Sequence, residues 1–147
     1  EGGEVVIVGL QRGGADFAQI LADNIKDITG TTTSCGLLDV SYYRDDLGEK
    51  PLPVSHATTL DGDLTGKVVV LVDDVLYTGR TIRAVINELF DYGRPAKVDL
   101  AVLADRHRRQ LPVDATFKGA KVQVSDEQIL VLSQNDEGKL SISLQTK

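Results

Sequence analysis

A run of apolar, mostly β-branched residues that ends in two adjacent carboxylates constrains this chain more than any other feature. Residues 68–72 are Val-Val-Val-Leu-Val, and Asp73 and Asp74 follow them directly. A strand that is apolar at every position is typical of a parallel sheet covered on both faces. Open sheets of that kind bind ligands outside the carboxyl ends of their strands, which is where these carboxylates lie. The feature therefore predicts an α/β protein with a ligand site at Asp73 and Asp74.

The residues after the carboxylates are suited to a phosphorylated ribose. A short loop, Thr78-Gly79-Arg80-Thr81, precedes residues 81–90, which have the apolar spacing of a helix. A helix N-terminus favours phosphate through its unpaired N–H groups and its dipole. Thr78 is alternatively an N-cap, and Arg80 either adds charge at the phosphate or pairs elsewhere. The two carboxylates can accept hydrogen bonds from ribose hydroxyls, directly or through hydrated Mg²⁺.

The remaining chain alternates strands and helices. Strands are predicted over residues 5–10, 34–43, 67–73 and 98–104, helices over 15–28 and 81–90, and two or three short strands after residue 118. This alternation predicts a mostly parallel sheet with right-handed crossovers. The first helix places five apolar residues on one side: Phe17, Ile20, Leu21, Ile25 and Ile28. Residues 47–60 contain Gly and Pro without a period, which predicts a long loop.

Composition narrows the class of protein. The 147 residues suit one domain over residues 1–147. No apolar run is long enough to span a bilayer and no signal peptide is visible, so we expect no membrane partner. Cys35 is the only cysteine, which fits the cytoplasm and predicts a buried, inert thiol. The formal charge of −6 disfavours indiscriminate binding of nucleic acid but leaves room for a local basic patch.

Four stretches in order carry a family resemblance. Residues 73–81 (DDVLYTGRT) resemble the motif of type I phosphoribosyltransferases that binds phosphoribosyl pyrophosphate (PRPP). Residues 38–47, 91–95 and 103–112 join them in resembling the PyrR family, bifunctional pyrimidine operon regulators and uracil phosphoribosyltransferases. The competing interpretation is a doubly wound domain whose acidic pair only caps a helix. Members of the family carry a helix before the first strand, and this sequence opens almost directly on that strand, which suggests a processed, truncated or engineered chain.

The resemblance implies a fold and a reaction. The fold is that of type I phosphoribosyltransferases, a central mostly parallel sheet flanked by helices, with a flexible loop over the active site. The reaction converts uracil and PRPP into uridine monophosphate (UMP) and pyrophosphate with Mg²⁺ as cofactor. The regulatory role implies that UMP controls binding of an mRNA leader stem-loop, and that the protein is a homo-oligomer, dimeric or larger.

Residue roles follow from the same resemblance. Asp73 and Asp74 would hold the ribose and, through water, Mg²⁺, while residues 78–81 (Thr78, Gly79, Arg80 and Thr81) would bind the 5′-phosphate. Gln11-Arg12-Gly13-Gly14 would form the pyrophosphate loop, since adjacent glycines let backbone N–H groups turn towards an anion; an ordinary turn is the alternative. Arg44 opens the predicted long loop and would neutralise the leaving pyrophosphate; a solvated charged turn is the alternative.

The end of the fourth strand would form the base pocket. Ala104, Asp105 and Arg106 lie there, and Asp105 either contacts the base or forms a structural salt bridge with Arg106. Tyr77 occupies the position where purine-specific relatives carry an Asp, which argues against a purine substrate.

A basic cluster follows the base pocket. Arg108 and Arg109 are candidates for RNA binding, with a solvated basic turn as the alternative. Asp114 stands where the family usually has a basic residue, which should weaken binding of phosphates. The rival readings of the whole chain are therefore a nucleotide-sensing RNA regulator with weak or lost catalysis, an enzyme without RNA binding, and a transferase for another base.

Overall fold

A five-stranded parallel sheet forms the centre of the computed structural model, which describes residues 4–11, 13–39, 60 and 62–147. Its strands run in the order β2-β1-β3-β4-β5, and β6 and β7 form a separate antiparallel pair. The elements, in chain order, are β1 (Val5–Gln11), α1 (Gly13–Thr29), β2 (Ser34–Asp39), β3 (Val68–Leu76), α2 (Arg80–Leu89), the 3₁₀ turn η2 (Phe90–Tyr92), β4 (Lys97–Asp105), β5 (Phe117–Lys121), β6 (Gln128–Gln134) and β7 (Leu140–Thr146).

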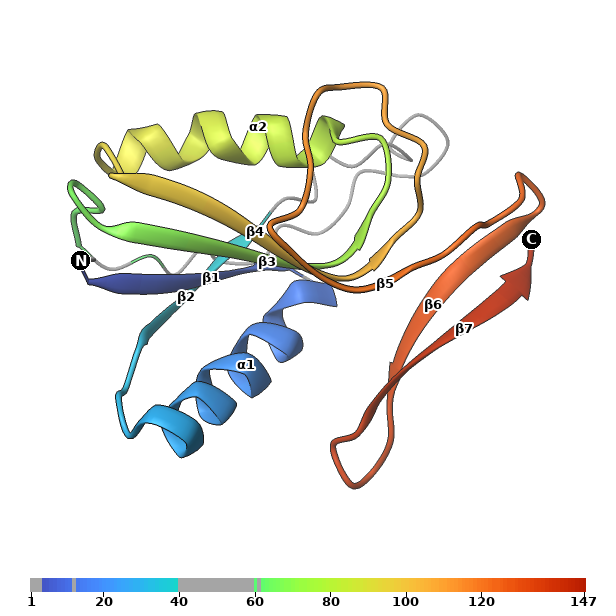
Figure 1. Cartoon of the computed structure of the whole chain (residues 1–147), viewed down its shortest axis with the longest axis horizontal. Coiled ribbons are helices and arrows are strands. Elements are labelled where there is room, and N and C mark those ends of the chain that lie inside the picture. The colour runs from blue at the N-terminus through green and yellow to red at the C-terminus, as the bar shows by residue number, and fades with distance from the viewer. Residues whose placement is uncertain (1–3, 12, 40–59, 61) are drawn as a thin grey trace.

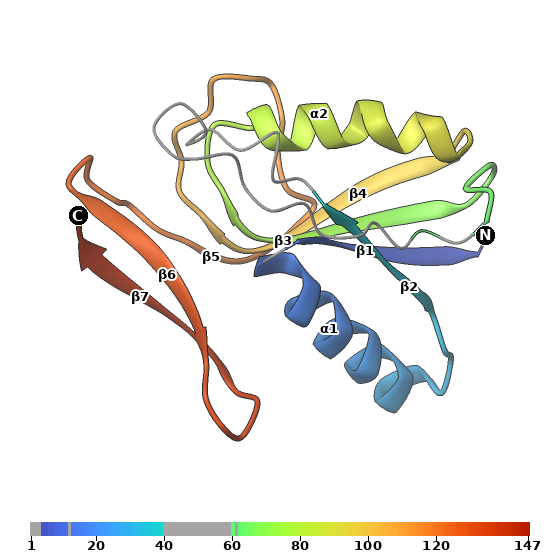
Figure 2. The same cartoon turned by 180° about the vertical axis from the view of Figure 1, so that it is seen from behind.

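The two helices cover opposite faces of the sheet (Figures 1 and 2). The chain steps from β1 outwards to β2 on one side and from β3 outwards to β4 on the other. Right-handed crossovers in opposite directions place α1 and α2 on opposite faces. The strand order therefore reverses between β1 and β3, and the crevice beyond their carboxyl ends is where such sheets bind ligands. The predicted α/β architecture, a central parallel sheet flanked by helices, is confirmed.

Each face of the sheet has its own apolar layer. On the α2 face, Ile82, Val85 and Leu89 are buried and Ile86 packs beside them, as the spacing of the helix predicts. On the α1 face, a second core cluster joins Ala18 and Ala22 of the helix to the strands; its members on the sheet are Ile7, Val72 and Ala101.

Two predictions about burial need correction. Ile28 was expected on the apolar side of α1, but it is 83% exposed because it lies in the last turn, beyond the edge of the sheet. Cys35 was expected to be buried, but it is exposed because β2 is an edge strand of the sheet. Desolvation and the nearby Asp23 carboxylate nevertheless raise the pKa of the Cys35 thiol, which disfavours the reactive thiolate.

The third strand is longer than its apolar run. β3 was predicted to end at Asp73 but continues to Leu76, because Val75 pairs with Ala104 and Leu76 with Asp105. The acidic pair therefore lies within the paired part of the strand rather than in the loop after it. The same pairing sets Ala104 and Asp105, two residues of the predicted base pocket, beside Val75 and Leu76, which lead into the loop at Thr78.

The C-terminal hairpin stands apart from the five-stranded sheet. β6 and β7 pair from Gln128↔Thr146 to Gln134↔Leu140, and Ile142 and Leu144 on β7 are exposed apolar residues. None of the helices in the described residues has the length and apolar composition needed to cross a bilayer. Arg44 and nearly all of the predicted long loop, residues 47–60, lie outside the described residues, as does Arg12.

Candidate functional site

The start of α1 is pressed against the acidic pair. A Cβ atom added to Gly14 would lie 2.1 Å from the carbonyl oxygen of Val72 and 3.0 Å from the Cα atom of Asp73. Only a residue without a side chain allows this approach, because real Cβ contacts are never so short. Gln11 ends β1 and α1 begins at Gly13, two residues earlier than predicted, so Gly13 and Gly14 of the predicted pyrophosphate loop lie in the first turn of the helix.

The two carboxylates point to opposite faces of the sheet. Val72 belongs to the core cluster on the α1 face, and side chains alternate along a strand, so Asp74 faces α1 and Asp73 faces α2. Each partly buried carboxylate also accepts a backbone hydrogen bond from the next residue, Asp73 from the N–H of Asp74 and Asp74 from that of Val75, both at 2.8 Å. These bonds limit the rotation of both side chains.

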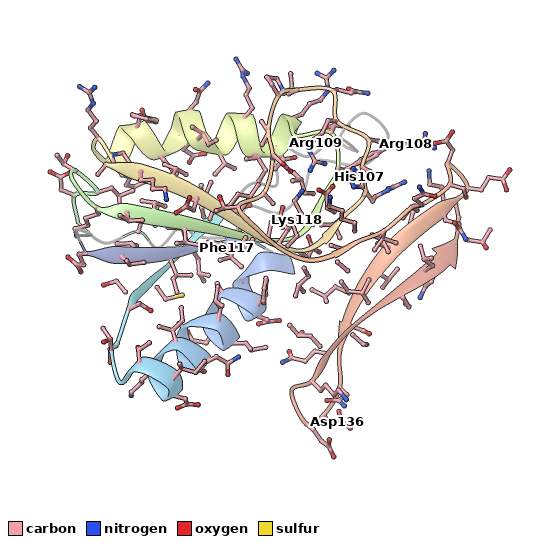
Figure 3. All side chains as sticks on the ribbon, viewed as in Figure 1. His107, Arg108, Arg109, Phe117, Lys118 and Asp136 are labelled. Atoms are coloured by element: carbon pink, nitrogen blue, oxygen red, sulfur yellow. The ribbon has the colours of Figure 1, made fainter. Side chains whose placement is uncertain are left out.

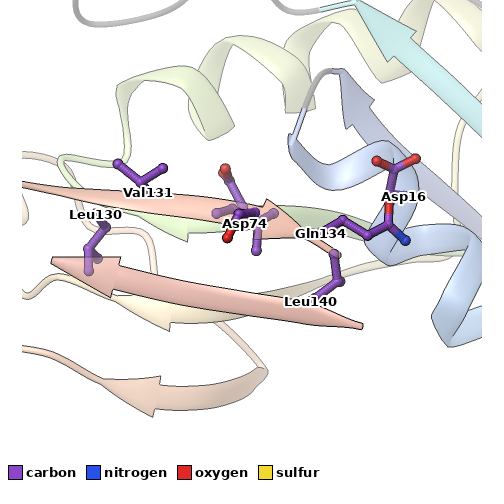
Figure 4. Close-up of a pocket in the computed structure, with 8 residues that line it drawn as sticks. Asp16, Asp74, Leu130, Val131, Gln134 and Leu140 are labelled. Carbon is purple, nitrogen blue, oxygen red and sulfur yellow. The ribbon is translucent and has the colours of Figure 1, made fainter. Parts of the chain in front are cut away.

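Asp74 lines a cleft between β3, α1 and the hairpin. The cleft has a volume of about 330 Å³, and Asp16 of α1 and Leu130, Leu132 and Leu140 of the hairpin are among the residues that line it. Figure 4 shows Asp16 and Asp74 on their separate elements beside the two hairpin strands. The acidic strand end is therefore open on the α1 side and partly covered by apolar side chains of the hairpin.

The donor set around the acidic pair suits Mg²⁺ only with help from a ligand. Among the described residues, no group of three or more His, Cys, Asp or Glu side chains could enclose a metal ion. Mg²⁺ usually keeps several waters and binds through one or two carboxylates plus phosphate oxygens of a substrate. Asp73 and Asp74 fit that mode of binding.

The loop before α2 has the backbone expected of a phosphate site. Gly79 is the N-cap residue, with φ of 92°, a conformation that favours glycine. Thr78 is 5% exposed, and its hydroxyl oxygen accepts a hydrogen bond from the N–H of Arg80 at 3.2 Å. The Arg80 side chain pairs elsewhere, since its Nε donates to Gln110 Oε1 at 2.8 Å. Thr81 lies in the first turn of α2.

A second loop, residues 106–114, packs against the loop before α2, the predicted phosphate loop. The N–H groups of Gln110 and Leu111 donate to the carbonyl oxygen of Thr78 at 2.9 and 3.2 Å. A Cβ atom on Gly79 would lie 3.3 Å from Cβ of Val113, so the Val113 side chain packs directly against the backbone of Gly79. We call residues 106–114 the basic loop, because it carries Arg106, His107, Arg108 and Arg109.

Asp105 is the buried centre of an ionic network. Its side chain is fully buried, and its carboxylate contacts Arg109 Nη2 at 2.8 Å, Lys118 Nζ at 3.2 Å and the N–H of His107 at 3.0 Å. Burial by itself would raise the pKa of Asp105, but these hydrogen bonds outweigh it and hold the pKa well below its usual range. The structural salt bridge considered for Asp105 thus exists, but with Arg109 and Lys118 rather than Arg106.

Asp114 completes the network from the surface. It lies 2.9 Å from Lys118 and 3.4 Å from Arg109. The hydrogen bond to Lys118 lowers the pKa of Asp114, and the same bond raises the pKa of Lys118. Sequence reasoning missed Lys118, which reaches Asp105 only because β5 pairs with β4; the one local signal was its spacing of four residues from Asp114.

The Arg106 side chain contacts Tyr77 rather than the acidic network of Asp105 and Asp114. Its guanidinium lies over the Tyr77 ring, 4.1 Å from the ring centroid, in a cation–π contact. Its Nε atom is buried without a hydrogen-bond partner among the described residues. A buried donor of this kind is costly unless a ligand or water meets it. Ala104, the first residue of the predicted base pocket, is fully buried in β4.

The basic loop is less positive than its sequence indicates. Figure 3 shows His107, Arg108, Arg109 and Lys118 gathered near the carboxyl ends of β3 and β4. Arg108 forms a salt bridge with Asp126, and Arg109 is only 21% exposed in its network with Asp105 and Asp114. Both arginines predicted to bind RNA thus already have acidic partners, and their role in RNA binding stays a prediction.

Sequence comparisons place the chain in a known family. The family model for the phosphoribosyl transferase domain matches residues 1–132. The bifunctional protein PyrR of Roseiflexus sp. (strain RS-1) is 51% identical over 128 residues, which cover 86% of this chain and 70% of that protein. The bifunctional protein PyrR of Nostoc punctiforme is 43% identical over 142 residues, 96% of this chain and 80% of that protein.

Solved structures of enzymes named for purine substrates have the same fold as this chain. A purine phosphoribosyltransferase from Pyrococcus horikoshii superposes with a TM-score of 0.60 at 32% identity, covering 80% of this chain and 70% of that one. A hypoxanthine phosphoribosyltransferase from Trypanosoma cruzi gives a TM-score of 0.65 at 23% identity over 81% of this chain. The chain spans 63% of the length of the latter, and at that identity the likeness shows the fold alone.

Proposed function

This chain belongs to the PyrR family of phosphoribosyltransferases, and we propose that it transfers the phosphoribosyl group of PRPP to uracil. N1 of uracil would form the new bond to C1′ as the bond from C1′ to pyrophosphate breaks, giving UMP and pyrophosphate, and the N1 proton would pass to solvent. One observation carries the proposal: the glycine turn, the acidic pair and the loop before α2 meet where the strand order reverses, with Gly14 touching β3 at Asp73.

The proposed roles follow the geometry of the crevice. Residues 78–81 at the start of α2 would bind the 5′-phosphate of PRPP and UMP. Asp73 and Asp74, held by their backbone hydrogen bonds, would accept hydrogen bonds from the ribose hydroxyls. The turn from Gln11 to Gly14 would bind pyrophosphate, with Arg12 and, on family resemblance, Arg44 adding positive charge as C1′ becomes electron-poor.

Phosphoribosyltransferases generally use Mg²⁺ with PRPP, and Asp73 and Asp74 would hold it here, mainly through water. When bound, the ion supplies positive charge that stabilises the departing pyrophosphate. The two carboxylates would orient the ribose whether or not each one contacts the ion directly. No covalent intermediate with a protein side chain is needed for this displacement.

The base would lie against β4 and the Arg106–Tyr77 pair. Uracil offers two carbonyl acceptors with an N–H between them, so it needs a donor–acceptor–donor edge. The buried, unpartnered Nε of Arg106 is suited to one of those carbonyls. The Asp105 carboxylate is committed to Arg109 and Lys118, and its backbone carbonyl accepts a hydrogen bond from the N–H of Val122, so among the three predicted residues we assign the base contact to Arg106.

A competition between bases tests this assignment. With PRPP and Mg²⁺, the protein should consume uracil and release pyrophosphate, while hypoxanthine and guanine should not react. The comparison matters because the solved neighbours named above act on purines. Faster turnover of either purine, measured as release of pyrophosphate, would overturn the choice of substrate.

The regulatory half of the function rests on the family. The relatives are named bifunctional proteins, and we propose that UMP in this site also controls binding of an mRNA leader stem-loop through Arg108 and Arg109. The acidic partners of both arginines favour weak binding, because an RNA phosphate must replace Asp126, Asp105 or Asp114. A cytoplasmic location and a homo-oligomeric state stay predictions.

A further inference from the structure

We propose that Arg109 is a positioning residue for the 5′-phosphate loop rather than primarily a contact for RNA. The inference rests on the proposed function, because it concerns how the phosphate site of that function is built. Arg109 lies in the basic loop, yet its guanidinium is directed inwards and is only 21% exposed. Its fork joins Tyr77 just after β3, Asp105 at the end of β4 and Val113 near the far end of the basic loop.

Besides its 3.4 Å contact with Asp114, the guanidinium meets three closer acceptors on three segments. Its Nη1 donates to the carbonyl oxygen of Tyr77 at 2.9 Å, its Nη2 to Asp105 Oδ2 at 2.8 Å, and its Nε to the carbonyl oxygen of Val113 at 2.7 Å. A planar fork of five N–H donors can meet acceptors in several fixed directions at once. A lysine ammonium at the end of a flexible stem presents a single point instead.

The contact with Tyr77 controls the first donor of the phosphate loop. In a trans peptide, the C=O of one residue and the N–H of the next point in opposite directions. Holding the Tyr77 carbonyl towards Arg109 therefore turns the Thr78 N–H away from the basic loop. The carbonyl of Thr78 is held the same way by the N–H groups of Gln110 and Leu111, which turns the Gly79 N–H to the same side.

Asp105 holds the arginine in place. The fully buried carboxylate binds Arg109 and Lys118 together, so the guanidinium cannot swing out to solvent without leaving a buried charge partly unpaired. The N–H of His107, whose φ of 58° is rare for a residue other than glycine, bonds to the same carboxylate. The turn at His107 and the network thus fix the basic loop against Thr78.

If Arg109 positions the phosphate loop, changing it should weaken binding only of ligands that carry a phosphate. Arg109→Lys should weaken binding of UMP by about 10- to 100-fold, the effect of losing one or two hydrogen bonds to a charged group. Binding of uridine, which has the same base and ribose without the phosphate, should not change. Both affinities can be measured by titration calorimetry or ligand-observed NMR, with the melting temperature recorded for every variant.

Two further variants complete the experiment. Arg109→Ala should show the same selective loss, and if it fails to fold, Arg109→Lys alone decides the question. Arg94→Ala is the matched control, since Arg94 is an exposed arginine just before β4, at the amino ends of the strands and away from the crevice, and it should leave both affinities unchanged.

The outcomes distinguish this inference from the function on which it rests. If Arg109→Lys binds UMP as the wild type does, or if it weakens UMP and uridine equally, Arg109 does not position the phosphate loop. If instead the wild-type protein neither binds UMP nor forms it from uracil and PRPP, the proposed function fails and the inference fails with it.

Discussion

At the scale of single residues, the carboxylates at the site differ in the groups that they contact. Asp73 and Asp74 accept local backbone hydrogen bonds and lie at the edge of the crevice. Asp105 has nearly the same sequence context, at the end of a neighbouring apolar strand, but its charge is neutralised by Arg109 and Lys118. Residues of one type at the same edge of the sheet therefore serve different purposes.

The acidic pair can be tested without changing its shape. Asp73→Asn with Asp74→Asn should abolish phosphoribosyl transfer, because both the ribose acceptors and the carboxylates for Mg²⁺ lose their charge. The fold should persist, since amides can still accept the local hydrogen bonds. Uracil turnover at saturating PRPP and a circular dichroism melt are the two measurements, and turnover near the wild-type rate would exclude the assigned role.

Asp105 should matter for stability in a pH-dependent way. Asp105→Asn removes one partner of a buried ion pair, so the free energy of unfolding at pH 7 should fall by about 3 kcal/mol. The pKa of Asp105 lies below its unfolded value, so its contribution is fully present above about pH 4 and is lost as the pH falls further. Urea titrations at pH 7 and pH 3 should show the gap between wild type and variant closing; a constant gap would contradict the network.

At the scale of elements, sequence reasoning succeeded where a pattern was local. The buried strands and the apolar face of α2 follow from periodicity, because Ile82, Val85 and Leu89 recur at helical spacing and are buried against the sheet. Sequence reasoning failed where a neighbouring element determines the outcome. Pairing with β4 extends β3, the edge position of β2 exposes Cys35, and pairing of β5 with β4 brings Lys118 to Asp105.

The contact between α1 and β3 provides an element-scale prediction. Gly14→Ala should lower the free energy of unfolding by about 1–3 kcal/mol, the usual cost of overpacking, and should greatly weaken binding of UMP because the helix start must move away from Asp73.

Gly66→Ala is the control for this change. It places a side chain at φ of 76°, with no atom within 4 Å of the new Cβ, so it should cost stability without affecting UMP binding. Equal effects of both variants on UMP affinity would show that the approach of α1 to β3 does not matter to the site.

At the scale of the whole molecule, electrostatics opposes RNA binding. The chain carries a formal charge of −6, and each arginine predicted for RNA has an acidic partner. The predicted affinity for a pyrimidine-leader stem-loop is therefore weak and falls steeply with salt, because it depends on few phosphate contacts. Arg108 is the better probe, since it is 48% exposed and lies outside the network of Asp105.

Filter binding at several salt concentrations, with and without UMP, provides the measurement. Arg108→Ala should reduce the slope of log affinity against log salt by about one, the effect of one lost phosphate contact. Asp126→Asn, which frees Arg108 from its partner, should strengthen binding. Tight binding that neither variant alters would mean that RNA occupies another surface.

The strand order also has a consequence for how the protein forms. β1 lies between β2 and β3, so during synthesis one edge of β1 stays unpaired after β2 is made, until β3, which begins at Val68, follows. Pairings between distant segments of a parallel sheet form slowly and expose unpaired edges while they wait. The strand that carries the acidic pair is thus also the one that covers the open edge of β1, so a nascent chain acquires the crevice between β1 and β3 only when these two strands pair.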